Sequence, residues 1–422
     1  MRVLTVIGTR PEAIKLAPVL HELERDADTF SSIVVTTGQH REMLDPMLEL
    51  FEIQPDYDLR LMRHGHSLGE ITRGVIAGLE PILGDERPDW VLVQGDTTTS
   101  MAASLAAFYD KTRVAHVEAG LRTFDKFAPY PEEINRRISG VLADVHFAPT
   151  AWARTNLLRE AVPPQHVHLT GNTVIDALEH VRELGFDLAG SPLEQLPDDK
   201  RLVLITAHRN ENLGPRMKDI ATGLRELALT HDDVHFVYPM HLNPRARQWA
   251  LVHLAGIENI SLLEPLAYAE TVWLLERAHL VVTDSGGLQE EAAGVGTPVL
   301  VLRETTERPE GIEAGIARLV EPEHTAIVAA VGQMLDDDDE YERMKSATCP
   351  YGDGRAAVRI TDVLAGRPAR LHAVDHIYER PLPAHPLDVL LREGTAASRR
   401  RADEVLTRAR ATSSRFVAKM LS

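Results

Sequence analysis

The feature that most constrains the fold of this chain is a repeated alternation between short β-branched runs and segments of helix length. A strand, a helix and a second strand in succession are typical of a βαβ unit, whose strands lie parallel. Six such runs occur in the first half of the chain: Val3–Ile7, Ile33–Thr37, Trp90–Val93, Val114–Val117, Val145–Ala148 and His166–Leu169. Between the first two runs, apolar residues recur at near-helical spacing over Glu12–Arg25.

The pattern stops after Gly185 at a polar stretch that contains Pro and Gly, residues 186–200, which we interpret as a linker. It then starts again with five runs: Leu202–Thr206, His235–Pro239, Ile260–Leu263, Leu280–Thr283 and Val299–Leu302. The sequence therefore predicts an α/β protein with two Rossmann-like, doubly wound parallel-sheet domains. The tripeptide Arg-Pro-Glu occurs at residues 10–12 and again at 308–310. The preference of Pro for the first helical position explains this short repeat.

Composition excludes several classes of protein. The 422 residues include 63 acidic and 45 basic residues, a net charge of −18, so neither nucleic acid nor an anionic membrane is expected as a partner. The single cysteine, Cys349, excludes an internal disulfide and a cysteine-based zinc site, and suits a reducing compartment. No apolar run approaches the ~20 residues that cross a bilayer, and the first run is too short for a secretion signal. We expect a cytoplasmic protein.

Unusual polar residues come directly after the predicted strands in both halves of the chain. Arg10, Asp96 and Glu118 follow strands of the first half, and His208 and Ser285 follow strands of the second. Ligands of open parallel sheets bind at the carboxyl ends of the strands. The sequence therefore predicts one active site in the cleft between the two domains.

One of these segments has the features of a phosphate site. Three residues open the helix that is expected after Thr283: Ser285, Gly286 and Gly287. Glycines let the backbone approach a ligand, and a helix start offers free N–H groups to phosphate. Glu291, one turn further on, could accept from a ribose diol, while Arg10 and Lys15 flank the first strand-to-helix turn and could neutralise a diphosphate. An ordinary Ser-capped helix is the alternative.

Three carboxylates, Asp96, Glu118 and Glu132, form a candidate acid/base set. Each also has a structural interpretation: Asp96 as a helix N-cap, Glu118 paired with Arg122, and Glu132 paired with Arg136 four residues on. His208 ends an apolar strand, where a core histidine is the alternative.

Other common chemistries have no support in the sequence. No GxGxxG follows the first strand, and there is no Walker lysine pattern, GxSxG elbow or set of closely spaced metal ligands. We therefore expect neither a nicotinamide cofactor nor a metal.

Eleven motifs, in order, carry a resemblance to a known family: GTRPEAIKLAP, GQHREML, QGDTTTS, HVEAGLRT, YPEEINR, TGNTVIDAL, TAHRNENL, YPMHLNP, TDSGGLQEEA, TTERPEGIEAG and PYGDGRA. Over about residues 1–366 the chain resembles the bacterial non-hydrolysing UDP-N-acetylglucosamine 2-epimerases. The resemblance implies a fold like that of GT-B glycosyltransferases, a homodimer, and a UDP-N-acetylhexosamine substrate converted without cofactor or metal. It also implies domains at 1–185 and 186–366, the second binding UDP, and a last helix that packs back on the first domain. Residues 367–422 are then an extension of unknown role.

The resemblance also assigns residues. It implies catalytic roles for Asp96, Glu118, Glu132 and His208, and binding of UDP and sugar by Arg10, Lys15, Ser285, Gly286, Gly287, Glu291 and Arg308. Some members of the family are activated by substrate at a second site, which Gln39, Arg209 and His241 match. Gly65 departs from the family pattern near that site by replacing a larger polar residue.

The chemistry agrees with these assignments. The C2 hydrogen of the sugar is not next to a carbonyl, so loss of UDP from C1 must assist its removal. Reversible elimination and re-addition of UDP would then convert UDP-N-acetylglucosamine to UDP-N-acetylmannosamine for surface polysaccharide synthesis. The alternatives are a hydrolysing 2-epimerase that releases UDP and N-acetylmannosamine, a UDP-sugar glycosyltransferase of the same fold, and a sensor that binds without turnover.

Overall fold

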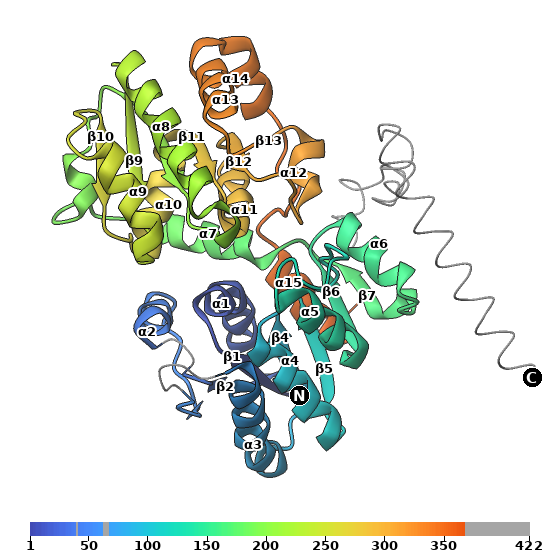
Figure 1. Cartoon of the computed structure of the whole chain (residues 1–422). Helices are drawn as coiled ribbons and strands as arrows, with labels where there is room; N and C mark the ends of the chain where they lie inside the picture. Colours follow the sequence, from blue (N-terminus) through green and yellow to red (C-terminus); the bar gives the residue numbers. More distant parts are fainter. Residues whose placement is uncertain (39–40, 62–66, 368–422) are drawn as a thin grey trace, which may run out of the picture. The chain divides into compact units, whose positions relative to one another are not determined.

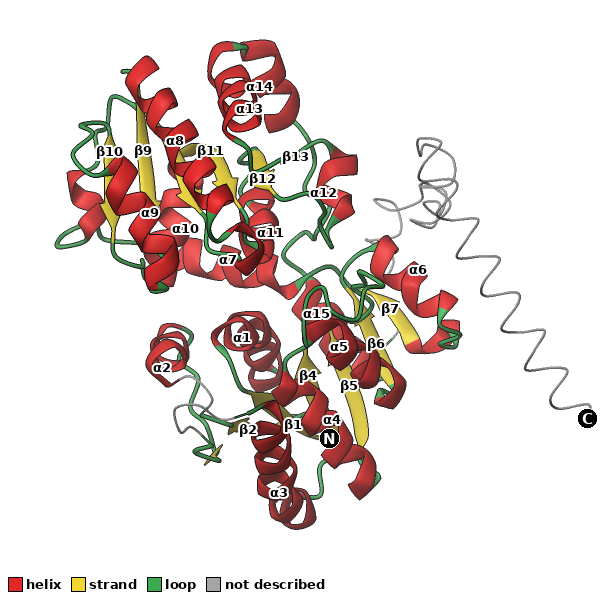
Figure 2. Ribbon diagram, in the orientation of Figure 1, coloured by secondary structure: helices red, strands yellow, loops and turns green. Residues whose placement is uncertain are grey.

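The structure is a computed structural model that describes residues 1–38, 41–61 and 67–367. Within these ranges the strands form two sheets, and every neighbouring pair of strands is parallel (Figures 1 and 2). The strand orders are β3-β2-β1-β4-β5-β6-β7 and β10-β9-β8-β11-β12-β13. The predicted fold class, two Rossmann-like parallel-sheet units, is confirmed.

The first sheet contains β1 (Arg2–Ile7), β2 (Ser31–Thr36), β3 (Tyr57–Asp58), β4 (Trp90–Gln94), β5 (Arg113–Val117), β6 (Val145–Ala148) and β7 (Val167–Leu169). Its helices are α1 (Arg10–Arg25), α2 (Arg41–Leu50), α3 (Leu68–Glu86), α4 (Thr98–Asp110), α5 (Glu132–Leu142), α6 (Ala151–Arg159) and α7 (Thr173–Leu184).

The second sheet contains β8 (Arg201–Thr206), β9 (Val234–Pro239), β10 (Ile260–Leu263), β11 (Ala278–Thr283), β12 (Val299–Leu302) and β13 (Ala317–Val320). Its helices are α8 (Pro215–Thr230), α9 (Pro244–Leu254), α10 (Tyr268–Arg277), α11 (Gly286–Gly294), α12 (Pro309–Ala314), α13 (His324–Asp336) and α14 (Asp338–Lys345), and α15 (Ala356–Leu364) follows them. Short 3₁₀ turns at Pro164–His166, Pro192–Gln195 and Asn210–Asn212 complete the order.

Alternate residues of the central strands enter different hydrophobic clusters, which is why helices cover both faces of each sheet. In β1, Val3 and Ile7 belong to the cluster that includes α1 and α7, whereas Leu4 and Val6 belong to the cluster of α3 and α4. The side chains of β8 divide between two clusters in the same way. Strands buried on both faces have nearly continuous apolar sequences, and this made them recognisable.

The predicted strands were correct to within one or two residues, but two strands were missed. β3 has only two residues, Tyr57 and Asp58, too few for a detectable pattern. β13, Ala317–Val320, carries an arginine within four residues and lies at the edge of its sheet.

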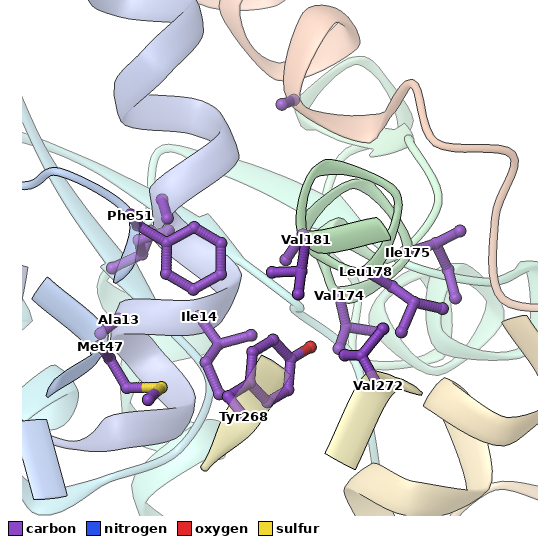
Figure 3. Close-up of a cluster of buried hydrophobic side chains, with 14 of the residues drawn as sticks. Ala13, Ile14, Met47, Phe51, Val174, Ile175, Leu178, Val181, Tyr268 and Val272 are labelled. Atoms are coloured by element: carbon purple, nitrogen blue, oxygen red, sulfur yellow. The ribbon is translucent and has the colours of Figure 1, made fainter. Parts of the chain in front are cut away.

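One hydrophobic cluster is shared by helices that belong to the two sheets. Figure 3 shows side chains of α1, α2, α7 and α10 gathered together, with Ile14 of α1 and Phe51 just after α2 from the first half, and Tyr268 and Val272 of α10 from the second. The ring centroids of Phe51 and Tyr268 are 6.1 Å apart. This packing supports α1, which carries Arg10 and Lys15.

Helix α15 contacts α1 and α7, so the end of the described chain returns to helices of the first sheet. The Asp176 carboxylate of α7 accepts from the backbone N–H groups of Ala356 and Ala357, at 3.2 and 2.8 Å. The buried Arg359 guanidinium donates to the Thr170 carbonyl at 2.8 Å and to Asp353. The domain boundaries stay a prediction, and residues 368–422 of the predicted extension lie outside the described residues. None of the described helices has the length and apolar character needed to cross a membrane.

Candidate active site

The strand order of each sheet reverses at one point, and four of the predicted site residues follow the strands that meet there. In the first sheet this point is between β1 and β4, which are followed by Arg10 and Asp96. In the second it is between β8 and β11, which are followed by His208 and Ser285. Doubly wound sheets bind their ligands at such switch points, because the helices diverge to opposite faces and leave the strand ends open.

Glu118 is a buried carboxylate held by three donors. Its backbone has a positive φ of 60°, a conformation that a non-glycine residue adopts only where its surroundings enforce it. Lys15 Nζ lies 2.5 Å from one carboxylate oxygen, Asn172 Nδ2 donates to that same oxygen at 3.3 Å, and the Gln94 amide donates to the other. The alternative pairing with Arg122 is wrong, since Arg122 binds Glu160 at 2.9 and 2.7 Å.

Asp96 lies beside Arg136, whose guanidinium is 2.6 Å from its carboxylate. It does not cap the following helix, because Thr97 is the N-cap of α4 and its side chain accepts from Ser100 N. Gly95, between Asp96 and β4, has a φ of 70°, and a Cβ there would lie 3.6 Å from Glu118 Oε2. The two carboxylates therefore flank one glycine turn.

Glu132, the first residue of α5, is half-buried, and its Oε2 is buried without a hydrogen-bond partner among the described residues. Burial raises the pKa of Glu132, and the nearby Asp96 charge raises it further, against the opposing charges of Arg136 and Arg209. A carboxyl group of this kind holds its proton to a higher pH than an ordinary glutamate does. Arg136, the predicted alternative partner of Glu132, forms its short ion pair with Asp96.

The start of α11 is open to a ligand. Ser285 is its N-cap residue but makes no side-chain capping bond, contrary to the alternative of an ordinary Ser-capped helix. A Cβ at Gly287 would meet nothing within 4 Å, whereas one at Gly286 would lie 2.6 Å from Arg308 Nη1. The helix start therefore has a guanidinium beside it and an uncovered backbone next to that, an arrangement suited to an anion.

Glu291 lies further along α11 and is buried. Burial raises the pKa of Glu291, and the positive charge of Arg10 at the start of α1 opposes this. A residue of the first sheet's half and one of the second thus act on each other electrostatically.

His208 and His241 stack with their ring centroids 4.7 Å apart and their planes 8° apart. The fully buried Asp284 fixes the segment that follows β8, since its Oδ2 accepts from the backbone N–H groups of His208 and Arg209 at 2.9 and 2.8 Å. Burial lowers the pKa of His208, and Asp284 only partly opposes this, which favours a neutral imidazole. His208 is partly exposed and does not behave as a core histidine.

The candidate second site is contiguous with this group in the structure. His241 stacks on His208, and Arg209 Nη2 lies 3.9 Å from Glu307. Gln39 lies outside the described residues.

Sequence reasoning missed two buried acids of the site. Glu290 accepts from Arg308 Nε at 2.7 Å and lies 3.4 Å from Lys15 Nζ. The Glu12 carboxylate accepts from the backbone of Gly8 at 3.0 Å and from the Thr97 hydroxyl at 2.7 Å. Burial raises the pKa of Glu12 to about 7. The only signal in the sequence was an acid near a helix start, which is usually a solvated residue that favours the helix dipole.

Comparison with known proteins identifies the family. The family model described as UDP-N-acetylglucosamine 2-epimerase matches residues 21–365. The UDP-N-acetylglucosamine 2-epimerase of Salmonella typhimurium is 52% identical over 370 residues, which are 86% of this chain and 98% of the relative. The crystal structure of UDP-GlcNAc 2-epimerase from Neisseria meningitidis bound to UDP-GlcNAc is 48% identical with a TM-score of 0.82, and covers 87% of this chain and 100% of that one.

A more distant structure shows the fold alone. The glycotransferase of kitacinnamycin is 13% identical, with a TM-score of 0.61 over 87% of this chain and 99% of that one. The resemblance seen in the eleven motifs is confirmed by the closer matches: this chain belongs to the UDP-N-acetylglucosamine 2-epimerase family of enzymes.

Proposed function

We propose that this enzyme interconverts UDP-N-acetylglucosamine and UDP-N-acetylmannosamine without net hydrolysis, and supplies surface polysaccharide synthesis. The observation that carries the proposal is that Glu118 and Asp96 adjoin Gly95, while contacts through Lys15 and Glu290 connect Glu118 with Arg308 beside the start of α11. Acid/base groups and an anion site are the two requirements of elimination and re-addition. The Neisseria meningitidis relative, crystallised with UDP-GlcNAc, supports the substrate class.

In the elimination step, a carboxylate takes the C2 proton, and the C2–H electron pair forms the C1=C2 bond. The C1–O bond breaks, and its electrons leave with the β-phosphate oxygen of UDP. Re-addition reverses these changes, with the proton delivered to the other face of C2. The atoms and charges balance without an oxidant, a metal or a water molecule.

We assign Glu118 to one face of the sugar and the Asp96–Glu132 pair to the other. The two groups have separate counterions, since Lys15 pairs with Glu118 and Arg136 with Asp96. Glu132, with its raised pKa, suits the acid of its pair.

We assign the diphosphate to the start of α11 and the uridine ribose to Glu291. Ser285, Gly286 and Gly287 supply hydroxyl and backbone donors, and Arg10, Lys15 and Arg308 supply positive charge. His208, with a lowered pKa, is suited to donate a neutral hydrogen bond to the departing oxygen. Arg209 and His241 adjoin this group, and with Gln39 they remain candidates for a second UDP-sugar site.

The test is a proton NMR experiment with UDP-N-acetylglucosamine in D₂O. We expect deuterium at C2 of the sugar nucleotide and formation of UDP-N-acetylmannosamine, with no net release of UDP. Stoichiometric release of UDP with free N-acetylmannosamine would instead establish the hydrolysing epimerase, and release of UDP with transfer to an acceptor a glycosyltransferase. Binding without any turnover would establish a sensor.

We also propose that the enzyme is a homodimer and works in the cytoplasm. Helices α4 and α5 pack together and expose large apolar side chains: Phe108, Tyr109, Ile134, Ile138 and Val141. Large apolar side chains exposed on neighbouring helices are typical of protein–protein interfaces. The single cysteine suits a reducing compartment.

A further inference from the structure

A line of buried charges joins the candidate base to the candidate diphosphate site. Lys15 Nζ lies between Glu118 Oε1, at 2.5 Å, and Glu290 Oε2, at 3.4 Å. The other oxygen of Glu290 accepts from Arg308 Nε at 2.7 Å, and Arg308 Nη1 donates to Glu307 at 2.6 Å. Glu290 is therefore the carboxylate that connects Lys15 of α1 with Arg308 of the second half.

The surroundings make this line electrostatically sensitive. Glu290 is 1% exposed, and Lys15, Glu118 and Arg308 are buried as well. In a medium of low dielectric constant, charges interact more strongly than in water. A new charge beside Arg308 therefore changes the interactions of Glu290, Lys15 and Glu118 as well. Burial favours the neutral forms of Lys15 and Arg308, but the adjacent carboxylates outweigh burial and hold the pKa of both above their usual values.

The two ends of the line coincide with the two reacting bonds of the proposed function. At one end, Arg308 adjoins the start of α11, as shown by the 2.6 Å approach of its Nη1 to a Cβ placed on Gly286. At the other end is Glu118, the proposed acid/base group for C2. The Glu290 carboxylate accepts from Lys15 Nζ and Arg308 Nε. These two cations adjoin Glu118 and the start of α11, which gives Glu290 an indirect route to both.

We propose that Glu290 is a positioning residue that couples cleavage of the C1–O bond to transfer of the C2 proton, an inference that rests on the proposed function. As the C1–O electron pair leaves with the β-phosphate oxygen, negative charge grows at that oxygen and attracts Arg308 away from Glu290. Glu290 then pairs more closely with Lys15 and draws it from Glu118. Glu118, with less of its charge neutralised, becomes the stronger base for the C2 proton at the moment when that proton becomes acidic.

The first test is Glu290→Gln, which keeps the shape of the side chain and removes its charge. Arg308 then keeps a hydrogen-bond partner but loses a competing anion, so UDP should bind as tightly as before or up to about tenfold more tightly. The value of kcat should fall about 10- to 100-fold, because Lys15 can no longer move toward a second carboxylate. A purely structural role would weaken UDP binding and turnover together, and that result would overturn the proposal, as would an unchanged kcat.

The second test is a double-mutant cycle with Lys15→Met. If Glu290 acts through Lys15, then Glu290→Gln should change kcat less than about twofold in the Lys15→Met background. If the kcat loss of the double variant equals the product of the losses of the two single variants, Glu290 does not act through Lys15, and the coupling is overturned. Glu340→Gln on α14 is the matched control: this partly buried acid pairs with Arg343 and Arg318 away from the proposed site, and its loss should leave kcat and UDP affinity unchanged.

Two further measurements keep the tests decisive. If Glu290→Gln does not fold, Glu290→Asp replaces it, because the shorter side chain keeps its negative charge. This variant should retain more activity than the Lys15→Met enzyme. Activity no higher than that of the Lys15→Met enzyme would count against the coupling. Deuterium incorporation at C2 by the wild-type enzyme tests the proposed function separately. If the wild-type enzyme incorporates deuterium at C2, the proposed function holds, and the results for the Glu290 variants then decide whether the proposed coupling is correct.

Discussion

Glu118→Gln isolates the charge of a buried side chain that three donors hold. The variant keeps a side chain of the same shape, and Asn172 Nδ2, now 3.3 Å from Glu118 Oε1, can still donate to an amide oxygen. What disappears is the anion 2.5 Å from Lys15 Nζ. Because Lys15 keeps Glu290 at 3.4 Å, it is not left without a counterion.

The expected effects differ in size between stability and catalysis. Breaking a buried ion pair costs about 3–5 kcal/mol when one charge is left alone. With Glu290 remaining, we expect a loss of about 1–3 kcal/mol in the free energy of unfolding, which a protein of ordinary stability survives. The value of kcat should fall about 10²- to 10⁴-fold, since loss of an acid/base group has that effect, while UDP affinity stays within about threefold.

Three assays separate these quantities: NMR measurement of turnover and C2 exchange, calorimetry of UDP binding, and urea unfolding followed by circular dichroism. Glu160→Gln is a matched control, because Glu160 is the partner of buried Arg122 and lies outside the proposed site. It should reduce stability and leave kcat unchanged. Near-normal turnover by Glu118→Gln, or equal losses of UDP affinity and kcat, would refute the assignment of Glu118 to proton transfer.

Three other predictions follow from described residues. Arg10→Ala should weaken UDP binding at least about tenfold by calorimetry, because it removes a cation of the diphosphate site, and unchanged affinity would contradict that role. Val141→Asp, at a residue 85% exposed on α5, should convert a dimer to a monomer in light scattering, and a dimer that persists would exclude this face. His116 is fully buried, and burial lowers its pKa from 6.5 to about 4, so the unfolded chain binds its proton first as the pH falls. His116 alone should therefore cost up to roughly 3 kcal/mol of stability as the pH falls from about 6.5 to 4, and His116→Gln should lack this contribution in urea unfolding; an equal slope of stability against pH in both proteins would contradict this.

The order of the elements could be predicted from the sequence because each element carries its own local pattern. Buried parallel strands are apolar throughout, and the helices between them are long enough to show a period. The short edge strand β3 has no such pattern, so nothing local distinguishes Tyr57–Asp58 from a loop. Its pairing with β2 decides that it is a strand.

The positions of the polar residues could be predicted for the same reason, but their partners could not. Local reasoning paired Glu118 with Arg122, four residues on, whereas its ion-pair partner Lys15 is 103 residues away in the chain. Asp96 pairs with Arg136, which local reasoning had given to Glu132. The carboxyl ends of parallel strands bring distant segments together, so the partner of a residue there depends on strand order rather than on sequence distance.

The repeated Arg-Pro-Glu shows how much a local explanation leaves out. Pro at a first helical position accounts for Pro11 and Pro309, and both do lie in the first turn of a helix. It does not account for the acids that follow: Glu12 is buried and Glu310 partly buried, and burial raises the pKa of each to about 7.

Each of these acids accepts from a threonine hydroxyl, and each threonine is the N-cap of another helix: Thr97 of α4 for Glu12, and Thr150 of α6 for Glu310. The first bond lies within one half of the molecule, whereas the second joins α12 of the second half to α6 of the first. The same three residues therefore fasten a helix start to a neighbouring helix start in both halves, which is a tertiary requirement. A helix preference alone would have been met equally well by an exposed acid.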